Sequence, residues 1–185
     1  MNTSSASKNH EPHSVVKLRM HRPDLENLPP TRLPAGYTLR HHHVGDEAAW
    51  LDLFRRIFAD DPRSGVAPKT EQDLRDEFLS SPDWKPERMW FAIAPDGQPA
   101  GMAMAWVTVE AVRPVAILHW VGVLGAYRGK HLGETLALAC LHQHKRDGWP
   151  DCWLTTEDFR AAAIRIYERL GFAVAYTMRD PAPPP

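Results

Sequence analysis

The sequence lacks long apolar segments and contains few cysteines. No apolar run approaches the roughly 18 residues that a membrane-spanning helix needs. Residues 1–12 are polar and lack the apolar core of a secretory signal. The only cysteines are Cys140 and Cys152, which fall on the apolar face of an expected helix and within an expected strand. We interpret both as buried free thiols rather than as a disulfide or a metal pair. These features predict a cytoplasmic protein that does not enter a membrane.

The chain also lacks an excess of charge of either sign. It has 22 Lys and Arg against 23 Asp and Glu among 185 residues, a formal net charge of −1. Such a balance creates no global field toward nucleic acid or a membrane surface, so we expect neither as a partner. With 43% apolar residues, a chain of this length can bury a core as a single domain.

Composition divides the chain into three parts. Residues 1–34 are rich in Ser, His and Pro, and we expect a flexible N-terminal extension there, with a short strand over 15–19 as an option. Residues 35–179 should form one domain. Residues 180–185, five of them Pro or Ala, should form a disordered Pro-rich tail.

Hydrophobic periodicity predicts an α/β fold with a mixed, mostly antiparallel sheet. A last helix, capped by Thr156 or Asp158, should end at Leu170. Gly148 and Gly171 are expected to stop the last two helices. The strand–helix–strand unit over 116–155 implies a parallel crossover. Strands are expected over 36–40, 89–94, 101–109, 116–124, 151–155 and 172–177, and the earlier helices over 47–59, 71–79 and 132–147.

The stretch 121–140 has the pattern of an anion-binding site. An apolar strand is followed by a loop rich in Gly, Lys and Arg, and then by Leu132, Leu136 and Cys140 at helical spacing. The first N–H groups of a helix lack intrahelical partners and lie at the positive end of its dipole. Glycine allows close approach, so the phosphate of a nucleotide-like cofactor is the natural occupant. The alternative is an ordinary turn with surface cations.

The last helix is expected to present two side-chain stripes. Phe159, Ala163, Ile166 and Leu170 should face the core, while Arg160 and Tyr167 share the neighbouring face. Ligands in such sheets gather at the carboxyl ends of parallel strands. The loop at 128–133 and the Arg160/Tyr167 face should therefore be neighbours.

Two segments together resemble the GCN5-related N-acetyltransferases, the GNAT superfamily. In 123–133, V-x4-R-G-K-H-L-G is similar to the family's R/Q-x-x-G-x-G/A pyrophosphate loop. In 154–172, L-T-T-E-D-F-R-x2-A-I-x2-Y-E-R-L-G-F is similar to its closing strand–helix–strand, which ends in Y-x-x-L-G-F. Their order and spacing make the resemblance specific. They cover the last third of the chain, and the order of elements fits the rest.

The resemblance implies a GNAT-like fold in which a parallel strand pair forms the cofactor cleft, and acetyl-CoA as co-substrate. It also implies direct acetyl transfer to a primary amine of a small molecule or peptide, with Tyr167 as general acid for the leaving thiolate. No metal is implied. The residues expected to bind the cofactor are Val121, Gly122, Val123, Arg128, Gly129, Lys130, His131, Leu132, Gly133, Glu134, Arg160, Ala163 and Tyr167.

Three departures from the family pattern stand out. His131 replaces the middle glycine of the loop, so its ring should point outward. Arg160 replaces the asparagine that is common at the start of the last helix. It is expected to meet either a CoA phosphate or the acceptor. The chain stops soon after Phe172, so the usual final hairpin should be shortened or missing.

His119 is the candidate general base. In a regular strand residues 117, 119, 121 and 123 share one face, which would put this polar ring among apolar neighbours. Some members, such as the serotonin N-acetyltransferases, carry histidine at the matching place. A satisfied core histidine is an equally good interpretation.

Other histidines do not suggest a metal site. Of the run 41–43, only alternate side chains can converge, and a solvated strand end is the better interpretation. His142 and His144 lie two apart on a helix and should both be at the surface.

Two further classes of function are compatible with the sequence. A catalytically weak CoA-binding regulatory module would keep the same motifs. A nucleotide-phosphate binder is less compatible, because no G-x-x-x-x-G-K-[ST] motif is present. The amine acceptor is not identified by the sequence. Dimers occur in the family, so a homodimer is compatible with it.

Overall fold

The computed structural model describes residues 15–58 and 66–179, so residues 1–14, residues 59–65 and the expected tail at 180–185 lie outside the description. The strands are β1 (Val16–Arg22), β2 (Thr38–His41), β3 (Met89–Ile93), β4 (Pro99–Glu110), β5 (Arg113–Val123), β6 (Cys152–Glu157) and β7 (Ala173–Arg179). The helices are α1 (Glu47–Phe58), α2 (Glu71–Leu74), the π-helical turn η2 (Arg75–Leu79), α3 (Leu132–Arg146), α4 (Ala161–Arg169) and the 3₁₀ turns η3 (Pro86–Arg88) and η4 (Gly125–Tyr127).

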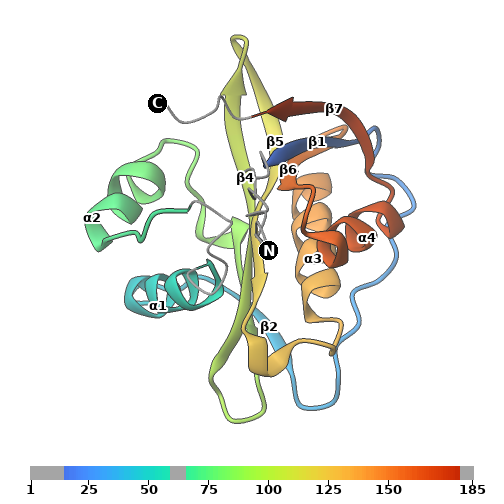
Figure 1. The fold of residues 1–185 in the computed structure, drawn as a ribbon. Coiled ribbons are helices and arrows are strands. Elements are labelled where there is room, and N and C mark those ends of the chain that lie inside the picture. Colours follow the sequence, from blue (N-terminus) through green and yellow to red (C-terminus); the bar gives the residue numbers. More distant parts are fainter. Residues whose placement is uncertain (1–14, 59–65, 180–185) are drawn as a thin grey trace, which may run out of the picture.

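The strands form one sheet in the order β2-β3-β4-β5-β6-β1-β7. All neighbours are antiparallel except β5 and β6, which run parallel. The α1 and α2 helices cover one face and the α3 and α4 helices the other (Figure 1). Each face buries its own apolar cluster. The predicted mixed sheet with one parallel pair is thus confirmed. None of the helices in the described ranges is long and apolar enough to cross a membrane.

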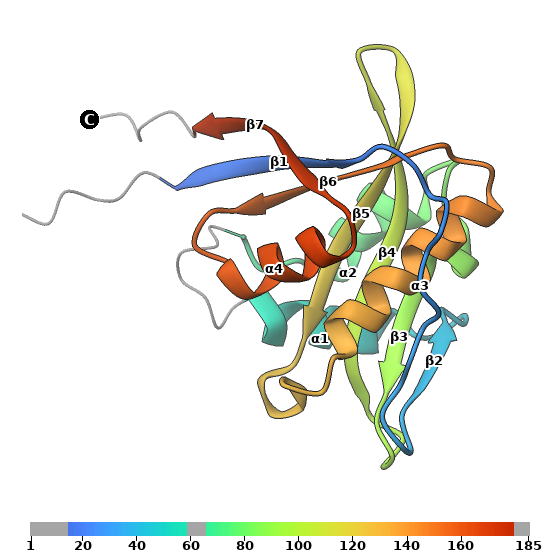
Figure 2. The same ribbon diagram turned by 90° about the vertical axis from the view of Figure 1, so that its right-hand side faces the viewer.

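The β1 strand changes the expected domain boundary. Residues 16–22 fall in the segment expected to be flexible, with a short strand over 15–19 as the option, and they form a strand inside the sheet between β6 and β7 (Figure 2). Met20 is completely buried there. The strand that pairs with β7 is therefore supplied by the N-terminal part of the chain. The domain begins before residue 35, because β1 carries buried apolar side chains that only the sheet can cover.

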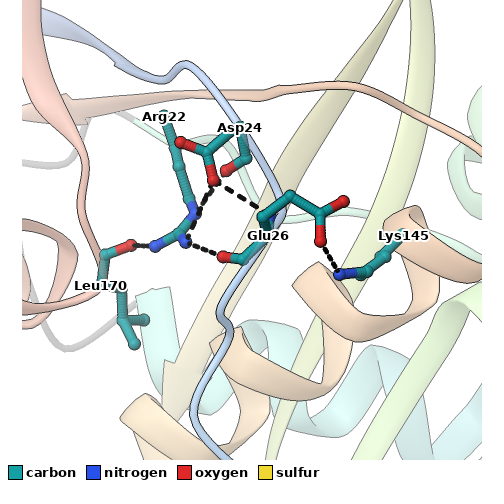
Figure 3. A network of polar contacts seen from close by, with 5 residues as sticks. All are labelled: Arg22, Asp24, Glu26, Lys145 and Leu170. Carbon is teal, nitrogen blue, oxygen red and sulfur yellow. Dashed lines mark hydrogen bonds and ion pairs between the residues drawn. The ribbon is translucent and has the colours of Figure 1, made fainter.

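Polar contacts anchor the segment after β1 to both helices of one face (Figure 3). Arg22 donates to the backbone oxygen of Glu26 at 3.0 Å and to that of Leu170, at the end of α4. The Glu26 carboxylate accepts from Lys145 Nζ of α3 at 2.6 Å. These contacts fix the direction in which the chain leaves the sheet.

Most expected helix ends are confirmed, but one cap is wrong. Thr70 forms a capping box with Asp73 at the start of α2. Gly148 and Gly171 have φ of 82° and 83°, the left-handed conformation of helix stops. The start of α4 has no side-chain cap, and its N-cap residue is Arg160 rather than Thr156 or Asp158. The reason is that β6 continues through 157, so the helix begins later than expected.

A bulge in β5 overturns the expected alternation of side chains. Met104 pairs with His119, but Met102 pairs with Gly122, so β5 holds one extra residue between these pairs. Trp120, within the bulge, has φ of 48°. His119 therefore faces the α1/α2 side, whereas Val121 packs against the cluster on the α3/α4 side. The four residues 117, 119, 121 and 123 do not share one face.

Two histidines expected at the surface are buried. His42 is 5% exposed and meets Trp50 and Trp84 edge-on. His144 is completely buried, and its Nε2 lies 3.1 Å from the backbone oxygen of Ile117. Its position four residues after Cys140 continues the buried stripe of α3, which is the signal that the surface interpretation missed. Cys140 and Cys152 are buried free thiols, as predicted.

Candidate active site

A cavity of about 750 Å³ lies where β5 and β6 separate. The two strands share one register pair, Ile117 with Trp153, and the rest of the edge of β5 is not paired with β6. The cavity extends to the N-terminal part of α4 and to η2. Of the predicted site residues, five line it: His119, Val121, Arg160, Ala163 and Tyr167.

Tyr167 contributes the phenol of the cavity. Its side chain is 8% exposed, and its ring packs edge-on against Phe172 at 6.1 Å. Burial raises the pKa of Tyr167 to about 12, against the smaller lowering effect of the Arg160 charge. The phenol therefore stays protonated at any physiological pH and can act as a proton donor.

His119 lies on the opposite wall of the cavity, among aromatic rings. Its ring centroid is 4.7 Å from Trp120 and 6.0 Å from Phe78. Burial, with a smaller contribution from the charge of Lys69, lowers the pKa of His119 to about 3. The imidazole is thus neutral near pH 7 and has a nitrogen lone pair available as a weak proton acceptor.

Arg160 belongs to the cavity. Its Nε lies 2.5 Å from Glu157 Oε2, and its guanidinium lies over the rings of Phe58 and Phe159 at 5.9 and 5.5 Å. The other end of α4 meets the start of α3. Since α4 spans nine residues, Arg160 lies about 13 Å farther along the helix axis. This position fits contact with an acceptor better than contact with a pyrophosphate at the start of α3.

The loop before α3 has the backbone of an anion site. His131 has φ of 58° and its side chain is 81% exposed, so the ring points outward, as the departure from glycine required. Gly129 has φ of 76°, and a Cβ added there would meet nothing within 4 Å. The N-cap residue His131 makes no side-chain hydrogen bond to the first amide groups of the fifteen-residue α3, which lack intrahelical partners. These residues fit the pyrophosphate of CoA.

The remaining predicted cofactor residues surround that loop and do not line the cavity. Arg128 Nε donates to the backbone oxygen of Val123 at 3.3 Å. Lys130 is exposed, and Leu132 is buried below the loop. Glu134 accepts from Arg169 at 2.9 Å, which lowers the pKa of the Glu134 carboxyl. A Cβ added at Gly133 would lie 3.8 Å from the side chains of Val123 and Ile166.

Gly122 is required by close packing. An added Cβ would lie 2.4 Å from Ile57 of α1, so no larger residue fits at this point of the bulge. The strand edge from the bulge to Val123 pairs with β4 on one side only. Its other side offers backbone groups to an extended ligand.

Sequence reasoning missed five charged residues that also line the cavity. They are Lys17, Arg19, Glu77, Glu110 and Glu157. The first two come from β1, where polar residues alternate with Leu18 and Met20. That alternation was the available signal for a half-buried strand. In the described ranges no three His, Cys, Asp or Glu side chains gather in a way that could hold a metal ion.

Comparisons with known proteins show what the chain is similar to. Residues 49–172 match the family model described as the acetyltransferase (GNAT) family. The chain is 34% identical over 173 residues to a mycothiol acetyltransferase from Thermomonospora curvata, covering 92% of this chain and 56% of that protein. It is 37% identical over 155 residues to a mycothiol acetyltransferase from Nocardiopsis dassonvillei, covering 79% and 45%. The chain thus spans about half the length of the curated relatives it matches.

Solved structures share the fold. A GCN5-related N-acetyltransferase from Sphaerobacter thermophilus superposes with a TM-score of 0.71 at 22% identity, over 90% of this chain and 50% of that one. Another from Kribbella flavida gives a TM-score of 0.58 at 20% identity, over 92% and 62%.

Proposed function

The chain belongs to the GNAT family of acetyltransferases, and from this premise we propose that it transfers an acetyl group from acetyl-CoA directly to a primary amine of a small molecule. The observation that carries the proposal is the position of the buried Tyr167 phenol. It lines a cavity at the point where β5 and β6 separate. Acetyl-CoA, when bound, supplies a thioester whose acetyl carbon is taken by the amine as the thiol leaves.

Tyr167 is the proposed proton donor to the departing sulfur. Its raised pKa keeps the proton on the phenol until the thiolate develops beside it. Backbone N–H groups along the unpaired edge of β5, near Val121, would donate to the thioester oxygen. Such donors are most effective in a site that excludes water.

His119 is the proposed acceptor of the proton that the amine loses. It is neutral and lines the same cavity as Tyr167. A ring with a pKa of about 3 is a weak base, so the amine must reach the site already neutral and lose its proton to His119, directly or through a water molecule, as it attacks.

The loop and the start of α3 are the proposed holders of the CoA pyrophosphate. Arg128 and Lys130 add positive charge to the backbone amides there, while His131 and Gly129 supply the left-handed backbone. The unpaired strand edge at 121–123 would take the pantetheine arm.

A small acceptor is supported by two observations. The cavity volume of about 750 Å³ is that of a small-molecule site. The relatives' shared name, mycothiol acetyltransferase, also points to a small molecule. A peptide amine would need an open groove, and no observation favours one.

The test measures binding and turnover separately. Thermal melts are recorded with acetyl-CoA, CoA, ATP and NAD, and a ligand at about 100 times its Kd should stabilise the protein by about 2.7 kcal/mol. Thiol release is then followed with a panel of amines. Stabilisation by neither CoA species would refute the proposal. Stabilisation without thiol release from any amine would identify a CoA-binding regulatory module instead.

A further inference from the structure

Arg19 is a buried cation of the cavity to which the proposed chemistry gives no role. Its side chain is 7% exposed and lines the cavity. It comes from β1, the strand that is inserted between β6 and β7. Lys17 stands two residues earlier on the same face of that strand and also lines the cavity. The N-terminal strand therefore brings two cations into the site.

Neighbouring side chains hold the Arg19 guanidinium in one position. Nη2 lies 2.6 Å from Glu110 Oε1, and Nη1 donates to Thr155 Oγ1 at 3.2 Å. The guanidinium lies over the ring of Trp153 at 5.3 Å, and that ring stacks on His21 at 3.9 Å. A planar group held in this way is already oriented for a ligand, so little side-chain entropy is lost on binding.

The same guanidinium has fewer partners than donors. It carries five N–H groups, and its side-chain acceptors among the described residues are the two oxygens just named. Its Nε is buried without a hydrogen-bond partner among the described residues. Glu110, the carboxylate paired with it, is 45% exposed and can turn toward water. A buried charge with incomplete pairing is costly unless a further anionic oxygen completes it.

We propose that Arg19 determines acceptor specificity by binding a carboxylate, or a similar anionic oxygen group, that the acceptor carries apart from its amine. The guanidinium fork matches two oxygens of such a group. The amine would then lie toward Tyr167 and His119, and the anionic group toward β1. Arg160 is less suited to this role, because its partner carboxylate, Glu157, is only 18% exposed and is less able than Glu110 to turn toward water. The inference rests on the proposed function and narrows its substrate to amines of the amino acid type.

The experiment compares acceptors that differ only in charge. Amino acids with one to four carbons between amine and carboxylate are paired with their carboxamides, and thiol release is measured at saturating acetyl-CoA. We expect the KM of the preferred amino acid to be at least about tenfold below that of its carboxamide, the effect of one charge-assisted hydrogen-bonded pair. Thermal melts with each acceptor and CoA give binding without turnover.

Two variants should change the KM of the amino acid in opposite directions. Arg19→Gln should raise it by about tenfold and leave the KM of the carboxamide unchanged. Glu110→Gln removes the competing carboxylate and should lower it. Arg146→Gln is the matched control, because Arg146 is an exposed cation in the last turn of α3 that does not line the cavity. It should change neither value.

If the Arg19–Glu110 pair has a purely structural role, each variant should treat the amino acid and its carboxamide alike. Both KM values would then rise together or both stay unchanged, and either result would overturn the inference. If Arg19→Gln does not fold, Glu110→Gln decides alone: an unchanged or raised KM for the amino acid refutes the role of Arg19. Equal KM values for the two acceptors in the native protein refute the inference and leave acetyl transfer intact. If no amine is acetylated, the proposed function fails. The inference about Arg19 is then tested by the thermal melts with CoA: equal stabilisation by the amino acid and its carboxamide refutes it.

Discussion

Glu134 Oε2 lies 2.9 Å from Arg169 Nη2, and this pair joins the first turn of α3 to the last turn of α4. The loop expected to hold the pyrophosphate therefore meets the C-terminal end of α4, while Arg160 lies at its N-terminal end and the cavity extends along the helix from Arg160 to Tyr167. The loop and Arg160 are far enough apart that variants in the loop should affect cofactor affinity and variants near Arg160 should affect acceptor use.

The first prediction concerns the cations of the loop. Replacing Arg128 and Lys130 by Ala should weaken CoA binding, and the loss should be larger at low salt than at high salt, because both side chains are exposed and their attraction to phosphate is screened. Isothermal titration at two ionic strengths measures this. Arg113→Ala, an exposed cation elsewhere, is the control. The same loss of affinity at both ionic strengths would contradict the phosphate assignment.

A second prediction follows from the left-handed backbone of His131, whose φ is 58°. Glycine adopts this conformation without a steric cost, so His131→Gly should stabilise the protein by about 1 kcal/mol or leave its stability unchanged. Urea unfolding measures the difference. A loss of stability would mean that the exposed ring makes a contact beyond its 3.8 Å approach to Glu134. CoA affinity, measured in parallel, shows whether the ring also contacts a phosphate.

Much of the fold could be predicted because most elements have clear local patterns. Apolar alternation and helical spacing located every strand after residue 35 and all four main helices. The place of β1 could not be predicted, because its partners lie more than a hundred residues away, as in the pair of Arg19 with Thr155. Its two cations were therefore absent from the predicted site.

Side-chain direction in β5 was the second limit. A strand of even alternation puts His119 and Val121 on one face, but the extra residue at Trp120 separates them. A bulge leaves no mark in hydrophobic periodicity, since it is set by the partner strand. The sequence therefore identifies His119 as a candidate base, but only the structure shows which wall of the cavity it lies on.

The third prediction concerns the pH dependence of turnover. Burial raises the pKa of Tyr167 to about 12, so the phenol should keep its proton up to pH 10. Deprotonation of Tyr167 should therefore cause no fall in the kcat of the native protein up to that pH. Tyr167→Phe keeps the ring packed on Phe172 and should lower kcat by about 10²- to 10⁴-fold. An unchanged kcat for this variant across pH would remove Tyr167 as the acid. Because the pKa of His119 is about 3, its titration should cause no loss of activity between pH 7 and 5.

The fourth prediction concerns acid stability and His144. Burial lowers the pKa of this ring to about 4, whereas the unfolded chain takes up the proton near pH 6.5. The unfolded state thus binds more protons in this range, and stability should fall as the pH decreases from about 7 to 4, by up to about 3 kcal/mol from this group. His144→Gln can still donate to the Ile117 oxygen and should flatten the pH dependence of urea unfolding. His142→Gln, on the same helix but partly exposed, is the control. Equal slopes for His144→Gln and the native protein would contradict the prediction.

The last prediction separates backbone strain from crowding at two glycines with almost equal φ. Gly148 has φ of 82°, and an added Cβ there would meet nothing within 4 Å. Gly171 has φ of 83°, but its added Cβ would lie 2.6 Å from Arg22 Nη1, the atom that donates to the Leu170 oxygen. Gly148→Ala should therefore cost about 1–2 kcal/mol from the left-handed backbone alone. Gly171→Ala should cost about 1 kcal/mol more, because the Arg22 contact that anchors the segment after β1 is lost as well. Urea unfolding of both variants, and of each in an Arg22→Gln background, tests this. In that background the two glycine variants should cost the same, and a persistent difference would show that Arg22 is not the cause.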